Sequence, residues 1–335
     1  MRLILCFVAL FLILPVQATE FRFADRDTAV AILTDESTGY FARMSAADPT
    51  VRLLSETPKT VADLKAAYAR GTRHFTPQER QDLEAILASE AANLAALAPW
   101  LPEQVVFVAV TDQVEGGLPH TRANAIVFPT GSLDNPEGRL QLFYHELFHV
   151  ISRAHSANHE PLYGLINFTR CSEIAIPDPY AARLITNPDA PVNNYWVPVR
   201  ADGEAIKVIP MLYAVSKTFN PRRGKGFGSQ FRLGFLEVQT DAAGRCTLVS
   251  GRDGTASVHQ PNQIAGLNEA AGGNTQYIIH PEEILADNFA LLMTGTSVRD
   301  AWVLDRLRDY LGLPADMDLA PAIAEDRPEP VTNTP

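Results

Sequence analysis

The sequence lacks an excess of positive charge, a long apolar run and an internal repeat. Its 28 lysines and arginines stand against 39 aspartates and glutamates, giving a formal net charge of −11. Such a balance disfavours nucleic acid and anionic membrane surfaces as partners. The apolar run at residues 3–14 has 12 members, whereas a bilayer-spanning helix needs about 20. We therefore expect no membrane span in the mature chain.

The first 18 residues have the pattern of a secretory signal peptide. Arg2 supplies a charged start, residues 3–14 form the short apolar core, and a small-residue ending places the cut after Ala18. The alternative is a membrane anchor, for which the apolar core is too short. We expect an exported protein, either periplasmic or secreted.

Cysteine is scarce, with three in the whole chain. Cys6 leaves with the leader, so the mature chain keeps Cys171 and Cys246. In an oxidising compartment these two either form a disulfide, which would close a long loop and stabilise the fold, or remain buried thiols. The sequence leaves both possibilities open.

The stretch His145-Glu146-Leu147-Phe148-His149 has the H-E-x-x-H pattern of zinc hydrolases. Residues four apart lie on one face of a helix, so both imidazoles can reach one ion. Glu146 projects beside that face, where it can meet a water on the metal without being a ligand. The apolar residues between 140 and 151 fall on the opposite face. We expect a helix beginning at Pro136, with one face packed and the other holding metal.

A catalytic zinc needs a third protein ligand and one open position, and His155 is the first candidate. The string from His145 to His155 is similar to the metzincin pattern H-E-x-x-H-x-x-G-x-x-H. Ser152 stands where that pattern has glycine, and serine adopts positive φ only rarely. If the helix continues through Ser152, His155 points away from the ion.

Glu283 is the second candidate. Pro281 begins an apolar helix in which Glu283 and Asp287 share one face. Two acids on so apolar a helix are costly to bury without partners, and a metal with its histidines would supply them. The alternative is that these acids lie at an exposed edge, favoured by the helix dipole.

H-E-x-x-H followed by a downstream E-x-x-x-D resembles the gluzincins, the thermolysin-like metallopeptidases. The resemblance implies that His145, His149 and Glu283 bind Zn²⁺ and that Glu146 is the general base. It also implies that Asp287 accepts a hydrogen bond from the other ring nitrogen of His145. The likeness covers about ten residues, the motif positions themselves.

Two departures limit this resemblance. The segment between His149 and Glu283 is far longer than in thermolysin. The family's motif for a histidine that steadies the tetrahedral intermediate is also missing. Tyr277 and His280 are candidates for that role by position. The alternative for His280 is that it caps the following helix. The stretches 117–122 and 280–289 also resemble a poorly characterised group of exported H-E-x-x-H proteins.

Local patterns predict further elements. A capping box at Thr76-Pro77-Gln78-Glu79 opens a long helix that should end near residue 98. Residues 105–110 and 125–128 read as strands. In a zincin lobe, the strand before the active-site helix forms the upper edge of the cleft, with His120 and Arg122 at its end. The alternative for these two is an ordinary loop. Asp202-Gly203 predicts a hairpin.

The sequence thus predicts an α+β fold, with a zincin-like lobe of short sheet, active-site helix and C-terminal ligand helix, interrupted by a long β-rich insertion. The expected divisions are a signal peptide at 1–18, the helical region, edge strands and H-E-x-x-H helix at 19–155, the insertion lining the cleft at 156–275, the ligand helix and C-terminal helix at 276–313, and a disordered tail at 314–335.

The function expected from these features is an exported zinc metallopeptidase acting on a peptide or protein substrate. Zinc-activated water would attack the peptide bond, with Glu146 as general base. One alternative is a non-catalytic, zinc-stabilised binding protein of the cell envelope. The other is a zinc hydrolase of non-peptide substrates. Cleavage preference and oligomeric state do not follow from the sequence.

Overall fold

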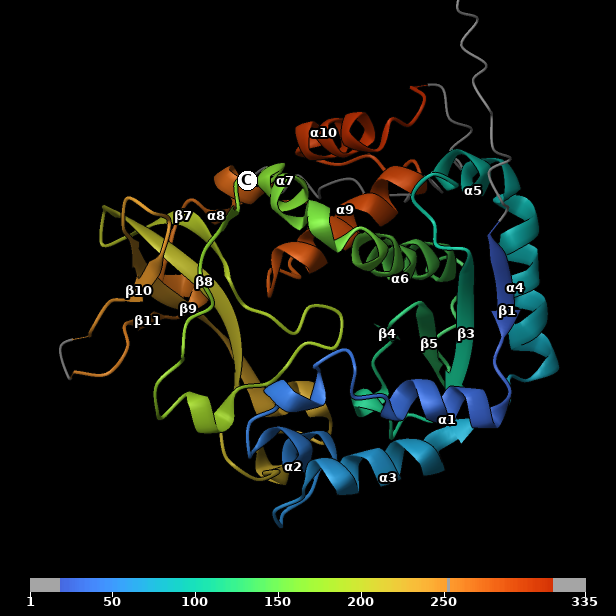
Figure 1. Ribbon diagram of the computed structural model, residues 1–335, viewed down its shortest axis with the longest axis horizontal. Coiled ribbons are helices and arrows are strands. Elements are labelled where there is room, and N and C mark those ends of the chain that lie inside the picture. The colour runs from blue at the N-terminus through green and yellow to red at the C-terminus, as the bar shows by residue number, and fades with distance from the viewer. Residues whose placement is uncertain (1–18, 252–253, 316–335) are drawn as a thin grey trace, which may run out of the picture.

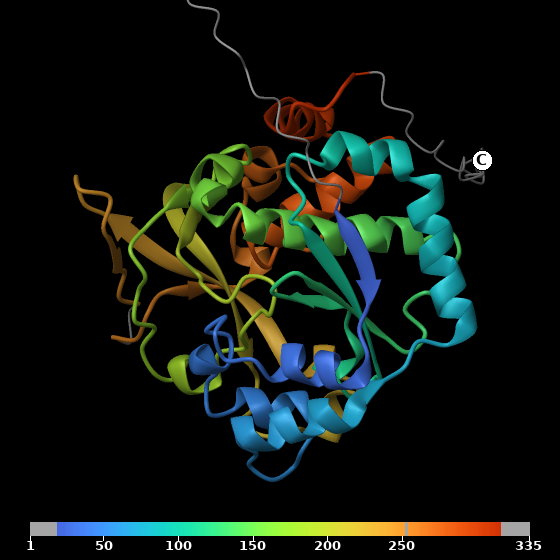
Figure 2. The same ribbon diagram turned by 45° about the vertical axis from the view of Figure 1, so that its right-hand side comes forward.

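The computed structural model describes residues 19–251 and 254–315, which form a mixed α+β fold with two sheets (Figures 1 and 2). The predicted leader lies outside the described residues, as does the predicted tail from residue 316 on. The helices are α1 (Arg26–Thr34), α2 (Asp48–Arg52), α3 (Val61–Gly71), α4 (Pro77–Ser89), α5 (Ala91–Leu97), α6 (Arg139–Ala154), α7 (His159–Gly164), α8 (Leu267–Ala271), α9 (Pro281–Met293) and α10 (Ala301–Leu311). The strands are β1 (Glu20–Phe23), β2 (Thr72–Arg73), β3 (Gln104–Val110), β4 (His120–Arg122), β5 (Ala125–Pro129), β6 (Thr169–Arg170), β7 (Tyr195–Ala201), β8 (Glu204–Ala214), β9 (Phe231–Thr240), β10 (Cys246–Leu248) and β11 (Val258–His259).

The first sheet has the order β1-β3-β5-β4, with β2 pairing alongside β3. Successive side chains of a strand point to opposite faces. Accordingly, Val106 and Val108 pack with α1 and α3, whereas Val105 and Phe107 pack with α6. Figure 1 shows the sheet between these helix layers. Burial on both faces explains why β3 is an almost unbroken apolar run.

The edge of this sheet differs from the prediction. The strand directly before the active-site helix, β5, is an interior strand that pairs in parallel with β3 and antiparallel with β4. The edge strand is β4, so His120 and Arg122 belong to the edge itself and are buried. Strand β4 has only three residues and follows a turn-rich stretch, so its sequence has the pattern of a loop and does not indicate a separate strand.

The second sheet is built by the predicted insertion. Its order is β10-β9-β8-β7-β6, with β11 also pairing with β9. Asp202 and Gly203 both have positive φ, which is the geometry of a type I′ turn, and the predicted hairpin is observed as β7–β8. Cys171 and Cys246 form a disulfide. The inner face of this sheet shares one apolar core with α6 and α9.

Helix α6 crosses above the first sheet and packs along α9 (Figure 2). It begins at Arg139, three residues later than predicted. The reason is local: the side chain of Asn135 accepts a hydrogen bond from the Glu137 backbone, which makes a separate turn ahead of the helix. None of the helices in the described part of the chain is long and apolar enough to cross a membrane.

The long helix predicted from Pro77 to residue 98 is two helices, α4 and α5, joined at Glu90. The predicted capping box at its start is present. Glu90 leaves helical geometry at φ −94° and ψ 12°, and its carboxylate accepts hydrogen bonds from Asn93 and from Tyr144 of α6. A contact with a distant helix therefore sets this break.

Candidate metal centre

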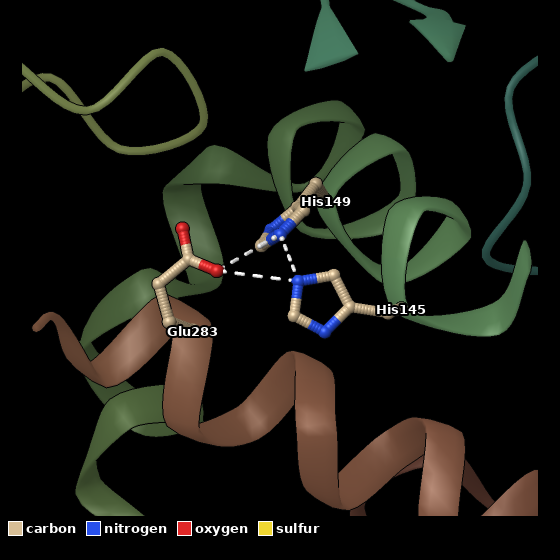
Figure 3. A group of neighbouring side chains, drawn as sticks. All are labelled: His145, His149 and Glu283. Carbon is tan, nitrogen blue, oxygen red and sulfur yellow. Dashed lines mark hydrogen bonds and ion pairs between the residues drawn. The ribbon is translucent and has the colours of Figure 1, made fainter. Parts of the chain in front are cut away.

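The two histidines of α6 and one glutamate of α9 converge on a single point (Figure 3). The His145 and His149 Nε2 atoms are 3.2 Å apart. Glu283 Oε2 lies 3.3 Å from Nε2 of His145 and 3.4 Å from Nε2 of His149. A tetrahedral zinc with bonds of about 2.0–2.1 Å places its ligands about 3.3–3.4 Å from one another. The three atoms thus have the separations of three zinc ligands.

The start of α9 directs Glu283 towards α6. His280 is the N-cap, and its Nδ1 accepts a hydrogen bond from the backbone N–H of Glu282. Pro281 occupies the first helical position, where its missing N–H costs nothing. These contacts fix the first turn of α9. The two glutamates that follow Pro281, Glu282 and Glu283, are both buried against α6.

The remaining ring nitrogens of both histidines are held by carboxylates. His145 Nδ1 donates to Asp287 Oδ1 at 2.7 Å, as the resemblance implies. His149 Nδ1 donates to Glu282 Oε1 at 2.9 Å, a partner that the sequence analysis did not identify. A proton held on Nδ1 leaves the lone pair of Nε2 free for a metal.

Glu282 also accepts hydrogen bonds from Ser152 and Tyr163, both at 2.7 Å. Glu282→Gln is expected to weaken zinc binding by about 10- to 100-fold. The reason is that an amide cannot accept three donors without turning its own NH₂ against one of them. Competition with a chromogenic chelator measures the change. Glu160→Gln, an exposed glutamate on α7, is the control, and equal affinities in the two variants would contradict this role.

Glu146 is buried beside the three ligand atoms but does not belong to them. Its Oε2 has no hydrogen-bond partner among the described residues. Burial and the nearby charge of Asp189 raise the pKa of Glu146 to about 8. A carboxylate with an unused oxygen next to the metal position has the placement of a general base.

The charge of the site calls for a cation. Glu282 and Glu283 are each at most 2% exposed, and ionised carboxylates are costly to bury without positive partners. Burial lowers the pKa of His145, but hydrogen bonds to Asp287 and Glu283 outweigh this and raise it to about 10. A divalent ion at the three ligand atoms would supply the positive charge. Two imidazoles, a carboxylate and an adjacent base fit zinc.

A cavity of about 330 Å³ opens in front of the metal position. Leu118 and Tyr277 flank it, with 46% and 40% of their surface exposed. The Tyr277 ring stacks near His145, with 6.1 Å between ring centroids. Tyr277 therefore remains the candidate for steadying a developing negative charge. The cavity is lined by Leu118, Pro119, Gly138, Gln141, Leu142, His145, Glu146, Asp189, Tyr277, Glu283 and Asp287.

The other two histidines considered from the sequence lie elsewhere. His280 is buried, and its Nε2 lies 3.2 Å from the carbonyl oxygen of Val192 while its Nδ1 caps α9. It does not line this cavity, and the contact of its Nδ1 is that of the predicted helix cap. His155 follows the last turn of α6, and its Nε2 lies 3.0 Å from the Trp100 carbonyl. It belongs to no metal-binding group of the described residues, as expected for a helix that continues through Ser152.

Two further residues reach the site from a loop far from both motifs. Asn187 donates to Glu283 Oε1 at 2.5 Å. Asp189 forms a second potential metal-binding group with Glu146 and His149, whose ligand atoms all lie within 4.8 Å of one another. The sequence around these residues, Asn187-Pro188-Asp189, reads only as a turn. Nothing in it points to the metal site.

Comparisons of the chain with known proteins add no family assignment. No protein-family model, no curated protein and no solved structure matches it. The function is therefore inferred from the geometry of the site itself.

Proposed function

We propose that this protein is an exported zinc-dependent metallopeptidase of gluzincin-like design. The observation that carries the proposal is the triangle of His145 Nε2, His149 Nε2 and Glu283 Oε2, with sides of 3.2, 3.3 and 3.4 Å. These separations match those of three ligands of one tetrahedral ion. Together with Glu146, they supply the donors and the base of a zinc hydrolase.

The surrounding architecture supports a zincin-like lobe. The short sheet ends in the edge strand β4, helix α6 crosses next to it, and α9 brings the third ligand from the C-terminal side (Figure 1). The second sheet belongs to the insertion and joins the same core. Metal ligands on two packed helices are held rigidly, which a catalytic constellation requires.

Each residue of the site has its own role in the proposed reaction. Zinc, when bound, supplies a Lewis acid that polarises a carbonyl group and makes water more acidic. Glu146 takes the proton of the attacking water and delivers it to the leaving nitrogen. Tyr277 donates a hydrogen bond to the oxygen on which negative charge develops. Asp287 and Glu282 keep both imidazoles oriented throughout.

The same features weigh against a purely structural zinc site. A structural site needs no base, yet Glu146 is buried beside the metal position with an oxygen that has no hydrogen-bond partner among the described residues. The exposed apolar side chains of Leu118 and Tyr277 at the cavity mouth favour a peptide substrate with apolar side chains. A hydrolase of non-peptide substrates would use the same residues.

Export is part of the proposal. The disulfide between Cys171 and Cys246 fits an oxidising compartment, in agreement with the leader predicted at residues 1–18. The net charge of −11 disfavours nucleic acid as a partner. A peptide or protein outside the cytoplasm is the substrate we propose.

The proposal is tested with the purified mature protein, by metal analysis and by digestion of a broad peptide library. We expect one zinc per chain, cleavage that a chelator abolishes, and recovery on addition of zinc. A zinc-loaded protein that cleaves no peptide, and whose melting temperature alone responds to the chelator, would instead be the envelope binding protein. Cleavage of esters or other acyl groups without peptides would identify a different hydrolase.

A further inference from the structure

A segment of the insertion lies across the metal site between β4 and α9. We call residues 184–194 the strap. One end is tied by the backbone N–H of Thr186, which donates to Asp48 at 2.8 Å. The other end is tied by the Val192 carbonyl, 3.2 Å from His280 Nε2. Its middle, with Asn187 and Asp189, therefore sits over the metal ligands.

The side chain of Asp189 is anchored through one oxygen. Oδ1 accepts hydrogen bonds from the backbone N–H and the hydroxyl of Thr121, at 2.7 and 2.5 Å. The nearest guanidinium, that of Arg153, also faces Oδ1 at 3.9 Å. The backbone N–H of Asp189 donates to Asn187 Oδ1 at 3.0 Å. These contacts hold Oδ1 against β4, and Oδ2 takes no part in them.

Asp189 approaches the metal position from the side of His149 and Glu146. Its ligand oxygen lies within 4.8 Å of the ligand atoms of His149 and Glu146. His149 is one corner of the zinc triangle, and Glu146 is the base that would face water at the open corner. To bind the ion, the Asp189 carboxylate would move from this position to about 3.3 Å from the other three ligand atoms, the separation in a tetrahedral site.

The strap also covers the outer side of the edge strand β4 and occupies a hydrogen-bonding group there. In a β-strand edge, outward N–H and C=O groups are the ones that pair with an extended peptide. Here the outward N–H of Thr121 is taken by Asp189. The Thr121 carbonyl accepts from Arg122 at 3.3 Å, and the Ala123 carbonyl accepts from Arg153 at 2.7 Å. An extended substrate cannot pair along β4 while the strap is in this position.

We propose that Asp189 is a fourth protein ligand of the metal, carried by the strap, and that the strap keeps the site closed until it is displaced. The assignment rests on the metal site of the proposed function. Its consequence is a resting form of the metal-loaded protein, in which Asp189 blocks the water position and the strap blocks the edge strand. Displacing the strap frees both together, so cleavage by the wild-type protein comes from the fraction of molecules in which the strap is displaced.

The test uses the Co²⁺-substituted protein, because its visible spectrum reports the ligands of the ion. Acetohydroxamate, a small chelating ligand, should leave the wild-type spectrum unchanged because the fourth position is filled. In Asp189→Asn, the amide oxygen can still accept from Thr121, so the strap stays anchored while the anionic ligand is lost. We expect acetohydroxamate to change the spectrum of this variant, and zinc affinity to fall by about tenfold or more. Peptide hydrolysis should rise in Asp189→Ala, which loses the anchor to Thr121 as well as the ligand.

Loss of metal affinity together with gain of hydrolysis separates a blocking ligand from a merely structural residue, whose removal lowers both. Asp305→Asn, an exposed aspartate on α10, controls for the change of charge. Asp189→Ala is the second variant if the asparagine binds metal through its oxygen. If wild type and both Asp189 variants respond identically to acetohydroxamate, the ligand assignment is overturned.

The outcome also separates this inference from the proposed function. A changed Co²⁺ spectrum with no peptide cleavage in any variant supports the ligand assignment and overturns the peptidase. Cleavage by the wild-type protein with an unchanged spectrum in both Asp189 variants supports the peptidase and overturns the ligand assignment.

Discussion

Glu146→Gln is expected to leave the metal bound and to lower peptide hydrolysis by about 10²- to 10⁴-fold. Glu146 is not one of the three atoms that surround the metal position, so zinc affinity should be little changed. Glutamine has nearly the same shape but cannot take a proton from water. The loss should therefore fall on kcat, with KM nearly constant.

The measurement is a steady-state assay on a peptide identified from the library digest, together with the zinc content of each preparation. Glu137→Gln, an exposed glutamate just ahead of α6, is the matched control and should keep full activity. A melting curve distinguishes loss of chemistry from loss of fold. Full turnover in zinc-loaded Glu146→Gln would show that another group is the base.

Glu115→Gln is expected to destabilise the fold by about 3–5 kcal/mol, because it leaves buried positive charge without a partner. Glu115 is 2% exposed and forms ion pairs with both Arg52 and Arg122. It also accepts hydrogen bonds from Tyr40 at 2.8 Å and Tyr68 at 2.5 Å. Urea unfolding, followed by fluorescence, measures the change in the free energy of unfolding.

The control is Glu36→Gln, which removes a surface ion pair with Lys65. Such exposed pairs contribute about 0–1 kcal/mol. Arg52 also donates to the Thr186 carbonyl and pairs with Asp48, so this buried network holds one end of the strap. Equal stability of the Glu115 and Glu36 variants would contradict the account.

The Glu115 variant should also change how stability depends on pH. Burial opposes its charge, but Arg52 and Arg122 outweigh burial and hold the pKa of Glu115 well below its ordinary value of 4.5. A depressed pKa stabilises the fold above the unfolded value, and this stability is lost as the pH falls towards the folded value. From about pH 4.5 downward, wild-type stability should fall more steeply than that of Glu115→Gln.

The sequence by itself determined the parts of this protein that depend on local patterns. H-E-x-x-H on an amphipathic helix places His145 and His149 together because helical spacing alone does so. The capping proline before Glu283, and the turn at Asp202-Gly203, are equally local. Convergence of the histidines with Glu283 followed from the cost of burying its charge without a cation.

Contacts between distant segments were decided only by the tertiary structure. The break at Glu90 depends on Tyr144 of another helix, and the edge strand depends on which strands pair. Glu282 is the partner of His149 because α9 packs on α6, and the sequence does not indicate this pairing. The position of Asp189 depends on the path of a long insertion. Neither spacing nor propensity encodes that path, because the hydrogen bonds that set it join residues far apart in the chain.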